Sequence, residues 1–395
     1  MVQDPIVIAG YARTPMGGFQ GALSPLKATD LGAAAVKAAI ERAKLPADAV
    51  DRIYMGCVLP AGLGQAPARQ AALGAGLGLN TEATTVNKMC GSGMQAAIMA
   101  HEALAAGAAD IIVAGGMESM TNAPHLVWSP AHGEDVPYSD LSSSMVHDGL
   151  WDAYNDEHMG CTGETVAKEF HISRADSDAF ALRSHQLAAK AWDVGLMDFE
   201  AFALPELACD EGTNGGVSQE SLAELNPVFA DDGQVTAGNA SQLSDGGAAV
   251  LVASASAAER HGWPVLARII DQNTDGVEPA RVMAAPMPTV NKMLQRNNLS
   301  IEDIDIVEHN EAFASASCAV AQELGISDEK LNPHGGAVAI GHPLGATGCV
   351  LMTKLVNDLE RTNTQYGLQT MCIGWGMATA TIIEKCNKVL PPRPR

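Results

Sequence analysis

Positive charge and aromatic rings are scarce in this sequence. Lys and Arg number 24 against 46 Asp and Glu, which gives a formal net charge of −22, and aromatic residues make up 4% of the 395 residues. A chain with this excess of negative charge repels polyanions, so we expect no nucleic-acid partner. The few aromatic residues and the 39 glycines favour closely packed small-residue helices over an aromatic-rich β-sandwich.

Long apolar runs and paired cysteines are also lacking. No apolar run reaches about 18 residues, so we expect no membrane-spanning helix and no membrane partner. The opening MVQDPIVIAG has no cationic segment before its apolar residues, and it predicts a first strand rather than a signal peptide. The eight cysteines include no C-x-x-C pair, which argues against a zinc or redox site and favours a reducing compartment. We therefore expect a cytoplasmic protein that holds no metal.

Short apolar runs alternate with Ala-rich helical patterns, which is typical of an α/β fold. We expect strands at residues 6–9, 53–54, 84–86 and 111–114. We expect helices at residues 31–44, 94–106, 175–191 and 346–359. The helix at 94–106 is apolar almost all round, which predicts a helix buried between two sheets.

The two ends of the chain resemble each other. Asp51 lies 39 residues before Cys90, and Asp305 lies 37 residues before His342. Each stretch ends at a glycine-flanked reactive side chain that precedes a helix, which indicates an internal duplication of one α/β unit. A chance likeness of two ordinary α/β segments is the alternative. We expect a first half at residues 1–120 plus 230–262, an inserted loop domain at 121–229 that covers the active site, and a second half at 263–395.

The segment VNKMCGSGMQAA places Cys90 in a tight turn between a strand and a helix. Free N–H groups at a helix N-terminus lower a thiol pKa and can hold a developing oxyanion. This placement predicts a nucleophile. A small buried cysteine in a glycine turn is the alternative.

The segment NPHGGAVAIGHPLGATG holds His342 on a stiff turn made by Gly341, Pro343 and Gly345. A histidine fixed in this way suits proton transfer or hydrogen bonding to a thioester oxygen. A surface histidine, or one whose hydrogen bonds are already satisfied, is the alternative.

Two further segments carry candidate groups. In MCIGWGMATATII, Cys372 follows a strand and could act as a base if its surroundings tune the thiol; a small core cysteine is the alternative. In VEHNEAFASAS, Asn310 and Glu311 follow a strand, and Asn310 could position a water or donate to a carbonyl. A helix cap is the alternative for Asn310.

The motifs NKMCGSG, NEAF and GHPLGATG together make the sequence resemble the thiolase family, in its acetyl-CoA acetyltransferase and 3-ketoacyl-CoA thiolase branch. The resemblance extends from ARTPMG near the start, through GGMESM and TAGNAS, to the final cysteine loop. It implies a thiolase-like α/β fold of two duplicated halves, layered around buried central helices, with an inserted loop domain.

The resemblance also implies a role for each candidate residue. Cys90 would attack an acyl-CoA and carry the acyl group. His342 would activate that thiol and, with a water held by Asn310, bind the thioester oxygen of the second substrate. Cys372 would exchange the α-proton of acetyl-CoA. The N–H groups of Cys90 and Gly374 would form a second oxyanion hole.

The same resemblance implies the substrates and the pocket. CoA and acyl-CoA would be substrates, and no cofactor would stay bound. His158 and Met159 would border the acyl pocket, Ser241 would contact the pantetheine arm, and Phe313 of NEAF would join the binding site. A homodimer or homotetramer is the implied assembly.

The sequence departs from the family pattern at two places. The final loop usually reads C-x-G-G-G-M-G, but here Trp375 replaces the middle glycine and Ala378 the last. The stretch 209–229 contains no Lys or Arg, although the family usually places cations there near the CoA phosphates. We therefore expect weaker and less salt-sensitive CoA binding than is usual for the family.

Three other functions compete with acetoacetyl-CoA synthesis and thiolysis. A degradative 3-ketoacyl-CoA thiolase would act on longer chains. A decarboxylating ketosynthase would share the fold, but Cys372 argues against it. A catalytically silent thiolase-like acyl-binding or scaffold protein would form no acyl-enzyme at Cys90.

Overall fold

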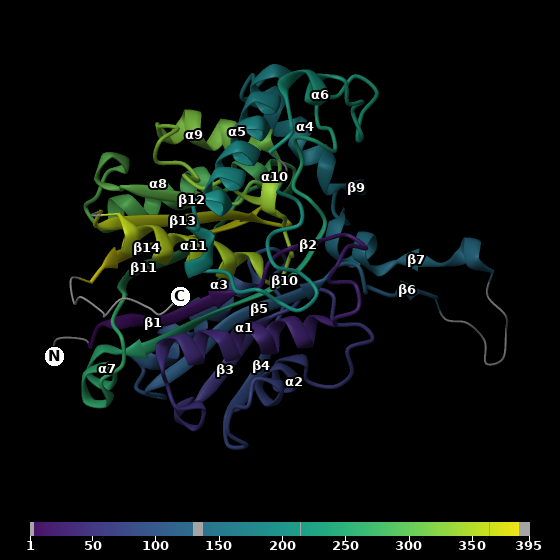
Figure 1. The fold of residues 1–395 in the computed structure, drawn as a ribbon. Coiled ribbons are helices and arrows are strands. Elements are labelled where there is room, and N and C mark those ends of the chain that lie inside the picture. Colours follow the sequence, from purple (N-terminus) through teal and green to yellow (C-terminus); the bar gives the residue numbers. More distant parts are fainter. Residues whose placement is uncertain (1–3, 129–136, 214, 363, 387–395) are drawn as a thin grey trace.

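Two β-sheet blocks lie on either side of a central helical layer (Figure 1). The structure is a computed structural model that describes residues 4–128, 137–213, 215–362 and 364–386. In Figure 1 the purple and blue block lies below, the yellow block lies above, and α3 and α11 lie between them. This arrangement agrees with the predicted α/β fold of two layered halves.

The elements follow in chain order. The first half contains β1 (Ile6–Arg13), β2 (Gly17–Gly18), α1 (Ala28–Ala43), β3 (Arg52–Gly56), α2 (Pro67–Gly74), β4 (Glu82–Val86), α3 (Ser92–Ala105) and β5 (Ile111–Ser119), then β10 (Ser244–Ser254) and α7 (Ala255–His261). Between β5 and β10 come β6 (His125–Leu126), β7 (Ser142–Ser143), the π-helical η3 (Met145–Leu150), β8 (Trp151–Asp152), β9 (Glu157–His158), α4 (Met159–Glu169), α5 (Arg174–Asp193) and α6 (Gln219–Ala223).

The second half contains β11 (Ala267–Gly276), α8 (Pro286–Arg296), β12 (Ile306–His309), α9 (Ala314–Leu324), α10 (Ala337–Ile340), α11 (Thr347–Arg361), β13 (Tyr366–Ile373) and β14 (Met377–Lys385). Short 3₁₀ helices are η1 (Ala47–Ala49), η2 (Tyr138–Asp140), η4 (Met197–Phe199), η5 (Pro279–Ala284) and η6 (Ile301–Asp303). Each helix and strand predicted from the sequence overlaps an observed element of the same type.

The strand order supports the predicted duplication. Hydrogen bonds connect the strands in the order β12-β13-β14-β11-β1-β10-β5-β3-β4. In the first block β1–β10 and β10–β5 are antiparallel and β5–β3 is parallel; in the second, β11–β14 and β14–β13 are antiparallel and β13–β12 is parallel. The short β1–β11 pairing joins the blocks. The two halves therefore repeat one topology.

The two central helices differ in burial. Every residue of α11 from Thr347 to Leu359 is buried. Helix α3 is buried along one side, but Ile98 and Met99 are only partly buried. The predicted position of α3 between the two sheets agrees with Figure 1, and α3 packs on β3, β5 and α11, but its burial is incomplete in a single chain.

The segment between β5 and β10 is anchored to the first strand by a buried ion pair. Arg13 donates from Nε to Glu200 Oε1 at 2.8 Å and from a terminal nitrogen to Asp210 Oδ1 at 2.7 Å. Removing one member of such a buried pair leaves the remaining charge buried without a partner, which is strongly destabilising. Within the described ranges, no helix has the length and apolarity needed to cross a membrane.

Candidate active site

Cys90 lies in the turn between β4 and α3. The turn is closed by Ser92, whose Oγ accepts from the Lys88 N–H at 2.8 Å and donates to the Met89 carbonyl at 2.6 Å. Met89 takes a positive φ of 46°, a conformation that side chains other than glycine rarely adopt. The backbone before Cys90 is thus held in one unusual shape at the start of a helix.

The Cys90 thiol is neutral at physiological pH. Burial raises its pKa to about 11, while hydrogen bonds from its own N–H and from the Gly374 N–H lower it. These two N–H groups come from opposite halves of the chain. They are the donors that the sequence analysis assigned to an oxyanion hole.

His342 is buried in the turn before α11, and its protonation follows from its neighbours. Its Nδ1 lies 2.6 Å from Thr347 Oγ1, and the Thr347 hydroxyl donates its single proton to the Pro343 carbonyl at 3.0 Å. His342 Nδ1 must therefore carry the hydrogen, which leaves a lone pair on Nε2. Burial lowers the pKa of His342 to about 4, so the neutral ring is a proton acceptor at pH 7.

Asn310 faces the free nitrogen of His342. Its Nδ2 lies 3.4 Å from His342 Nε2, and its buried Oδ1 has no hydrogen-bond partner among the described residues. Helix α9 begins at Ala314 with Phe313 at the cap position, so the alternative of a helix cap is wrong for Asn310. The amide has free hydrogen-bonding capacity next to His342.

Cys372 is buried near the end of β13. Burial raises the pKa of its thiol, and the neighbouring Cys90 raises it further. The two thiols are therefore close enough for the charge of one to disfavour ionisation of the other. The turn Gly374-Trp375-Gly376 connects β13 to β14 directly beyond Cys372.

Two glycines let the central helices touch at their N-termini. A Cβ at Gly348 would overlap the backbone of Met94, and one at Gly93 would lie 3.0 Å from both Cys349 N and Gly345 O. The turns that carry Cys90 and His342 are thereby held side by side. The two turns thus pack together although Cys90 and His342 are far apart in the sequence.

The predicted pocket residues lie around a group of three aromatic rings, those of His158, Phe229 and Phe313. His158 stacks on Phe229 with ring centroids 4.8 Å apart, and Phe229 meets Phe313 edge to face at 6.4 Å. Met159 packs in the same apolar cluster as Phe313. Ser241 is tied to the segment before Phe313, since its N–H donates to the Ala312 carbonyl at 2.9 Å. Phe229 was not singled out from the sequence, because it lies in a polar stretch far from any motif.

Two family models match this chain and together cover almost all of it. The thiolase N-terminal domain matches residues 6–256, and the thiolase C-terminal domain matches residues 263–385. The chain belongs to the thiolase family.

Similar proteins extend the comparison along the whole chain. A probable acetyl-CoA acetyltransferase of Escherichia coli is 43% identical over 388 residues, covering 96% of this chain and 99% of the relative. An acetyl-CoA acetyltransferase of Pseudomonas aeruginosa is 42% identical, covering 97% and 100%. The Acat5 thiolase of Ascaris suum, whose crystal structure contains coenzyme A, superposes with a TM-score of 0.91 at 35% identity and covers 97% of this chain and 100% of its own. The predicted thiolase family, fold and acyltransferase class are confirmed.

Glu118 belongs to this thiolase site but was not identified from the sequence. Its carboxylate accepts from the N–H groups of Val58, Leu59 and Gly345 at 2.9, 3.1 and 2.8 Å. Burial raises its pKa to about 7, and these hydrogen bonds lower it. Glu118 thus ties the first half to the turn that carries His342. GGMESM was recognised as a family segment, but only the fold reveals what its glutamate contacts.

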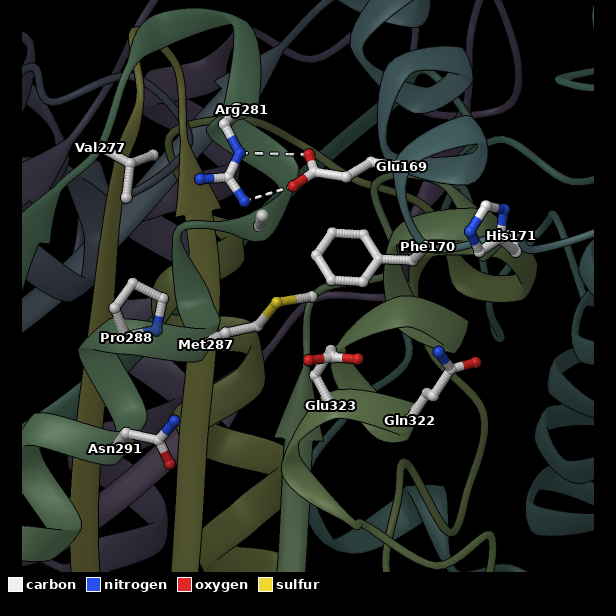
Figure 2. A pocket seen from close by; sticks show the side chains of 11 residues that line it. Glu169, Phe170, His171, Val277, Arg281, Met287, Pro288, Asn291, Gln322 and Glu323 are labelled. Carbon is white, nitrogen blue, oxygen red and sulfur yellow. Dashed lines mark hydrogen bonds and ion pairs between the residues drawn. The ribbon is translucent and has the colours of Figure 1, made fainter.

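A separate pocket of about 580 Å³ opens elsewhere on this thiolase (Figure 2). Arg281 pairs with Glu169 at its upper side in the view, and Phe170 and Met287 face each other across it. None of the predicted active-site residues lines it. The candidate chemistry therefore does not belong to this pocket.

Proposed function

We propose that this chain catalyses reversible acetyl transfer between thioesters, as an acetyl-CoA acetyltransferase that cleaves acetoacetyl-CoA and forms it by Claisen condensation. The observation that carries the proposal is the convergence on Cys90. The Cys90 turn packs against the end of β13 beside Cys372 and against the turn of His342: a Cβ at Gly91 would lie 2.5 Å from Ile373, and one at Gly93 would lie 3.0 Å from Gly345 O.

In the cleavage direction, Cys90 attacks the 3-keto carbon while His342 Nε2 accepts the thiol proton. The N–H groups of Cys90 and Gly374 stabilise the resulting oxyanion. Collapse of this intermediate breaks the bond between C2 and C3 and leaves an acyl group on Cys90. Because burial keeps both partners neutral, we expect proton transfer to accompany attack rather than a preformed thiolate–imidazolium pair.

The departing fragment is the enolate of acetyl-CoA. Its oxygen would be held by His342, which now carries a proton on Nε2, and by a water bound to Asn310. Cys372 would donate a proton to C2 and complete acetyl-CoA. A thiol with a raised pKa is suited to this role only when the enolate oxygen is stabilised in the same site. The thiol of free CoA then gives its proton to the Cys372 thiolate and attacks the acyl-Cys90. The departing Cys90 thiolate takes back the proton from His342 Nε2, so all three groups return to their starting states.

CoA would act as a substrate and not as a resident cofactor. In the described part of 209–229, acidic residues such as Glu220 and Glu224 are exposed, and this stretch holds no cation for the phosphates. The proposal therefore includes CoA binding that is weaker and less salt-sensitive than is usual for the family. We also propose that 121–229 covers the site as a separate domain, between a first half at 1–120 plus 230–262 and a second half at 263–395.

We propose a homodimer or homotetramer as the assembly. The partly buried Ile98 and Met99 on α3 and the edge position of β4 offer an apolar face and a strand edge that a second copy could cover. A cytoplasmic location is also proposed, because a long chain whose cysteines include no C-x-x-C pair fits reducing conditions.

The test is CoA-dependent thiolysis of acetoacetyl-CoA beside a long-chain 3-ketoacyl-CoA. We expect turnover of acetoacetyl-CoA that disappears in Cys90→Ala and persists in Cys209→Ala, which alters an exposed cysteine. A stronger preference for the long chain would favour the degradative function. Absence of turnover in a folded protein would favour the silent acyl-binding protein.

A further inference from the structure

Trp375 is an unusual residue at the tip of the β13–β14 hairpin. It takes a φ of +71°, in the left-handed region that favours glycine, and its side chain is 44% exposed. A bulky residue in this conformation is strained, and an exposed indole gains little from burial. It follows directly after Gly374, which lies beside the turn of Cys90, since a Cβ at Gly374 would be 3.5 Å from Met89.

The indole meets a residue from the segment between the two halves. Its ring lies 6.4 Å from that of Tyr154, centroid to centroid, in an edge-to-face arrangement. Such pairs attract each other beyond their shared buried area. Tyr154 stands in the turn between β8 and β9 and is 68% exposed. The contact therefore joins two hairpin tips that lie far apart in the sequence.

The Tyr154 hairpin is fixed by its own hydrogen bonds. Asp152 accepts from the Tyr154 N–H at 2.8 Å and from Asn155 Nδ2 at 2.6 Å, and Trp151 Nε1 donates to Asp156 at 3.1 Å. The turn is thus ordered without help from Trp375. The turn therefore holds the Tyr154 ring in a fixed position against which Trp375 can pack.

The base of the same hairpin contacts the aromatic rings of the predicted pocket. Trp151 pairs with His158 across its strands, and His158 stacks on Phe229. One end of the hairpin thus borders the predicted acyl pocket, while its tip touches the turn next to Gly374. The hairpin therefore connects the predicted pocket residue His158 with the turn that follows Cys372.

We propose that Trp375 and Tyr154 form the outer wall of the acyl pocket and limit the acyl group on Cys90 to short chains. This inference rests on the proposed thiolase reaction and specifies its substrate class. A glycine at 375 would remove the wall and would suit the backbone conformation, so the fold should tolerate it.

The test compares thiolysis of acetoacetyl-CoA and 3-ketooctanoyl-CoA by the full chain. We expect Trp375→Gly to raise the ratio of kcat/KM for the longer substrate over the shorter one at least about tenfold, the size of effect expected of pocket contacts. Tyr154→Ala should raise it less, because the indole remains. Tyr154→Phe keeps the ring and should leave the ratio within about twofold, since the contact is made by the ring.

A second readout is acylation of Cys90 by octanoyl-CoA, followed by intact mass. Trp375→Gly should acquire the octanoyl group faster than the unchanged protein. An unchanged ratio and an unchanged acylation rate in folded Trp375→Gly would overturn the inference while leaving the thiolase reaction intact. Absence of acetoacetyl-CoA turnover in the unchanged protein would instead refute the proposed function, and this inference with it.

Discussion

The two halves of the molecule place different side chains at equivalent positions. In the first half, Cys90 stands in the turn before α3; in the second, His342 stands in the turn before α11. Helix α11 is buried along nearly its whole length, whereas α3 keeps one face partly exposed. The comparison shows that one repeated α/β unit can supply a thiol from one copy and an imidazole from the other, because the N-termini of α3 and α11 lie together.

The difference in burial has chemical consequences. The His342 ring is buried deeply enough to lose its positive charge, whereas Cys90 keeps some access to solvent and hence to a substrate. Glycines at 93 and 348 bring the turns together, and Glu118 joins the halves a second time. The site is therefore a property of the interface between the halves, and the following predictions test that interface.

Removing the imidazole of His342, the group that the second half supplies, should have the largest effect on activity. His342→Ala eliminates the proton acceptor, and we expect kcat for acetoacetyl-CoA thiolysis to fall about a hundred- to ten-thousand-fold. His261→Ala, which alters an exposed histidine on α7, serves as the control. Activity in His342→Ala within a few-fold of the unchanged protein would contradict the assigned role.

Breaking the connection between the halves should cost stability. Glu118→Ala leaves three buried N–H groups without an acceptor, so we expect the free energy of unfolding to fall by about 2–3 kcal/mol. Denaturant unfolding measures this, with the exposed Glu102→Ala on α3 as the matched control. Equal stability of the two variants would show that Glu118 does not hold the halves together.

A change at Thr347 tests the orientation of the His342 ring without removing the ring. Thr347→Val leaves the Nδ1–H of His342 without its acceptor, and we expect kcat to fall about tenfold, which corresponds to the loss of one hydrogen bond. Thr347→Ser should restore kcat, because it returns the hydroxyl. If Ser and Val behave alike, the hydroxyl does not orient the ring.

The pH dependence of kcat/KM distinguishes a His342 whose pKa is lowered by burial from a histidine with the ordinary pKa. Because burial favours the neutral ring and lowers the pKa of His342 to about 4, kcat/KM should hold steady as pH falls through 6.5 and decline only near pH 4–5. The unfolded chain binds the proton near pH 6.5, so His342 makes folding stability fall as pH drops from there towards 4. A kcat/KM midpoint near 6.5 would contradict the burial argument.

The smallest expected effect concerns CoA binding. Without cations in 209–229, the dissociation constant for CoA should rise less than about threefold between about 0.05 and 0.5 M salt. Glu220→Lys introduces a cation in this stretch and should restore some salt dependence. Calorimetric titration measures both, and tight binding by the unchanged protein that weakens steeply with salt would contradict the account.

Much of this site could be predicted from local sequence. Cys90 and His342 each stand in a glycine-containing turn before a helix, and Cys372 lies near the end of β13 just before such a turn. These turns are visible in a few consecutive residues. The layered α/β fold and its duplication also follow from pattern and spacing. The family comparisons confirm the fold and the class of enzyme.

What could not be predicted depends on contacts between distant segments. The acceptor role of Glu118, the stacking of Phe229 on His158 and the pairing of Trp375 with Tyr154 each join residues that no local pattern connects. The partial exposure of α3 was missed because composition shows that a helix is apolar, but not what covers each face.

The most direct test of the central claim is the position of the acyl group. The protein is incubated with acetyl-CoA, digested, and its peptides are weighed by mass spectrometry. The account predicts one acetyl group per chain, on the peptide that contains Cys90, and none in Cys90→Ala. Acetylation of Cys372 or another cysteine instead, or no acetylation of a folded protein, would contradict it.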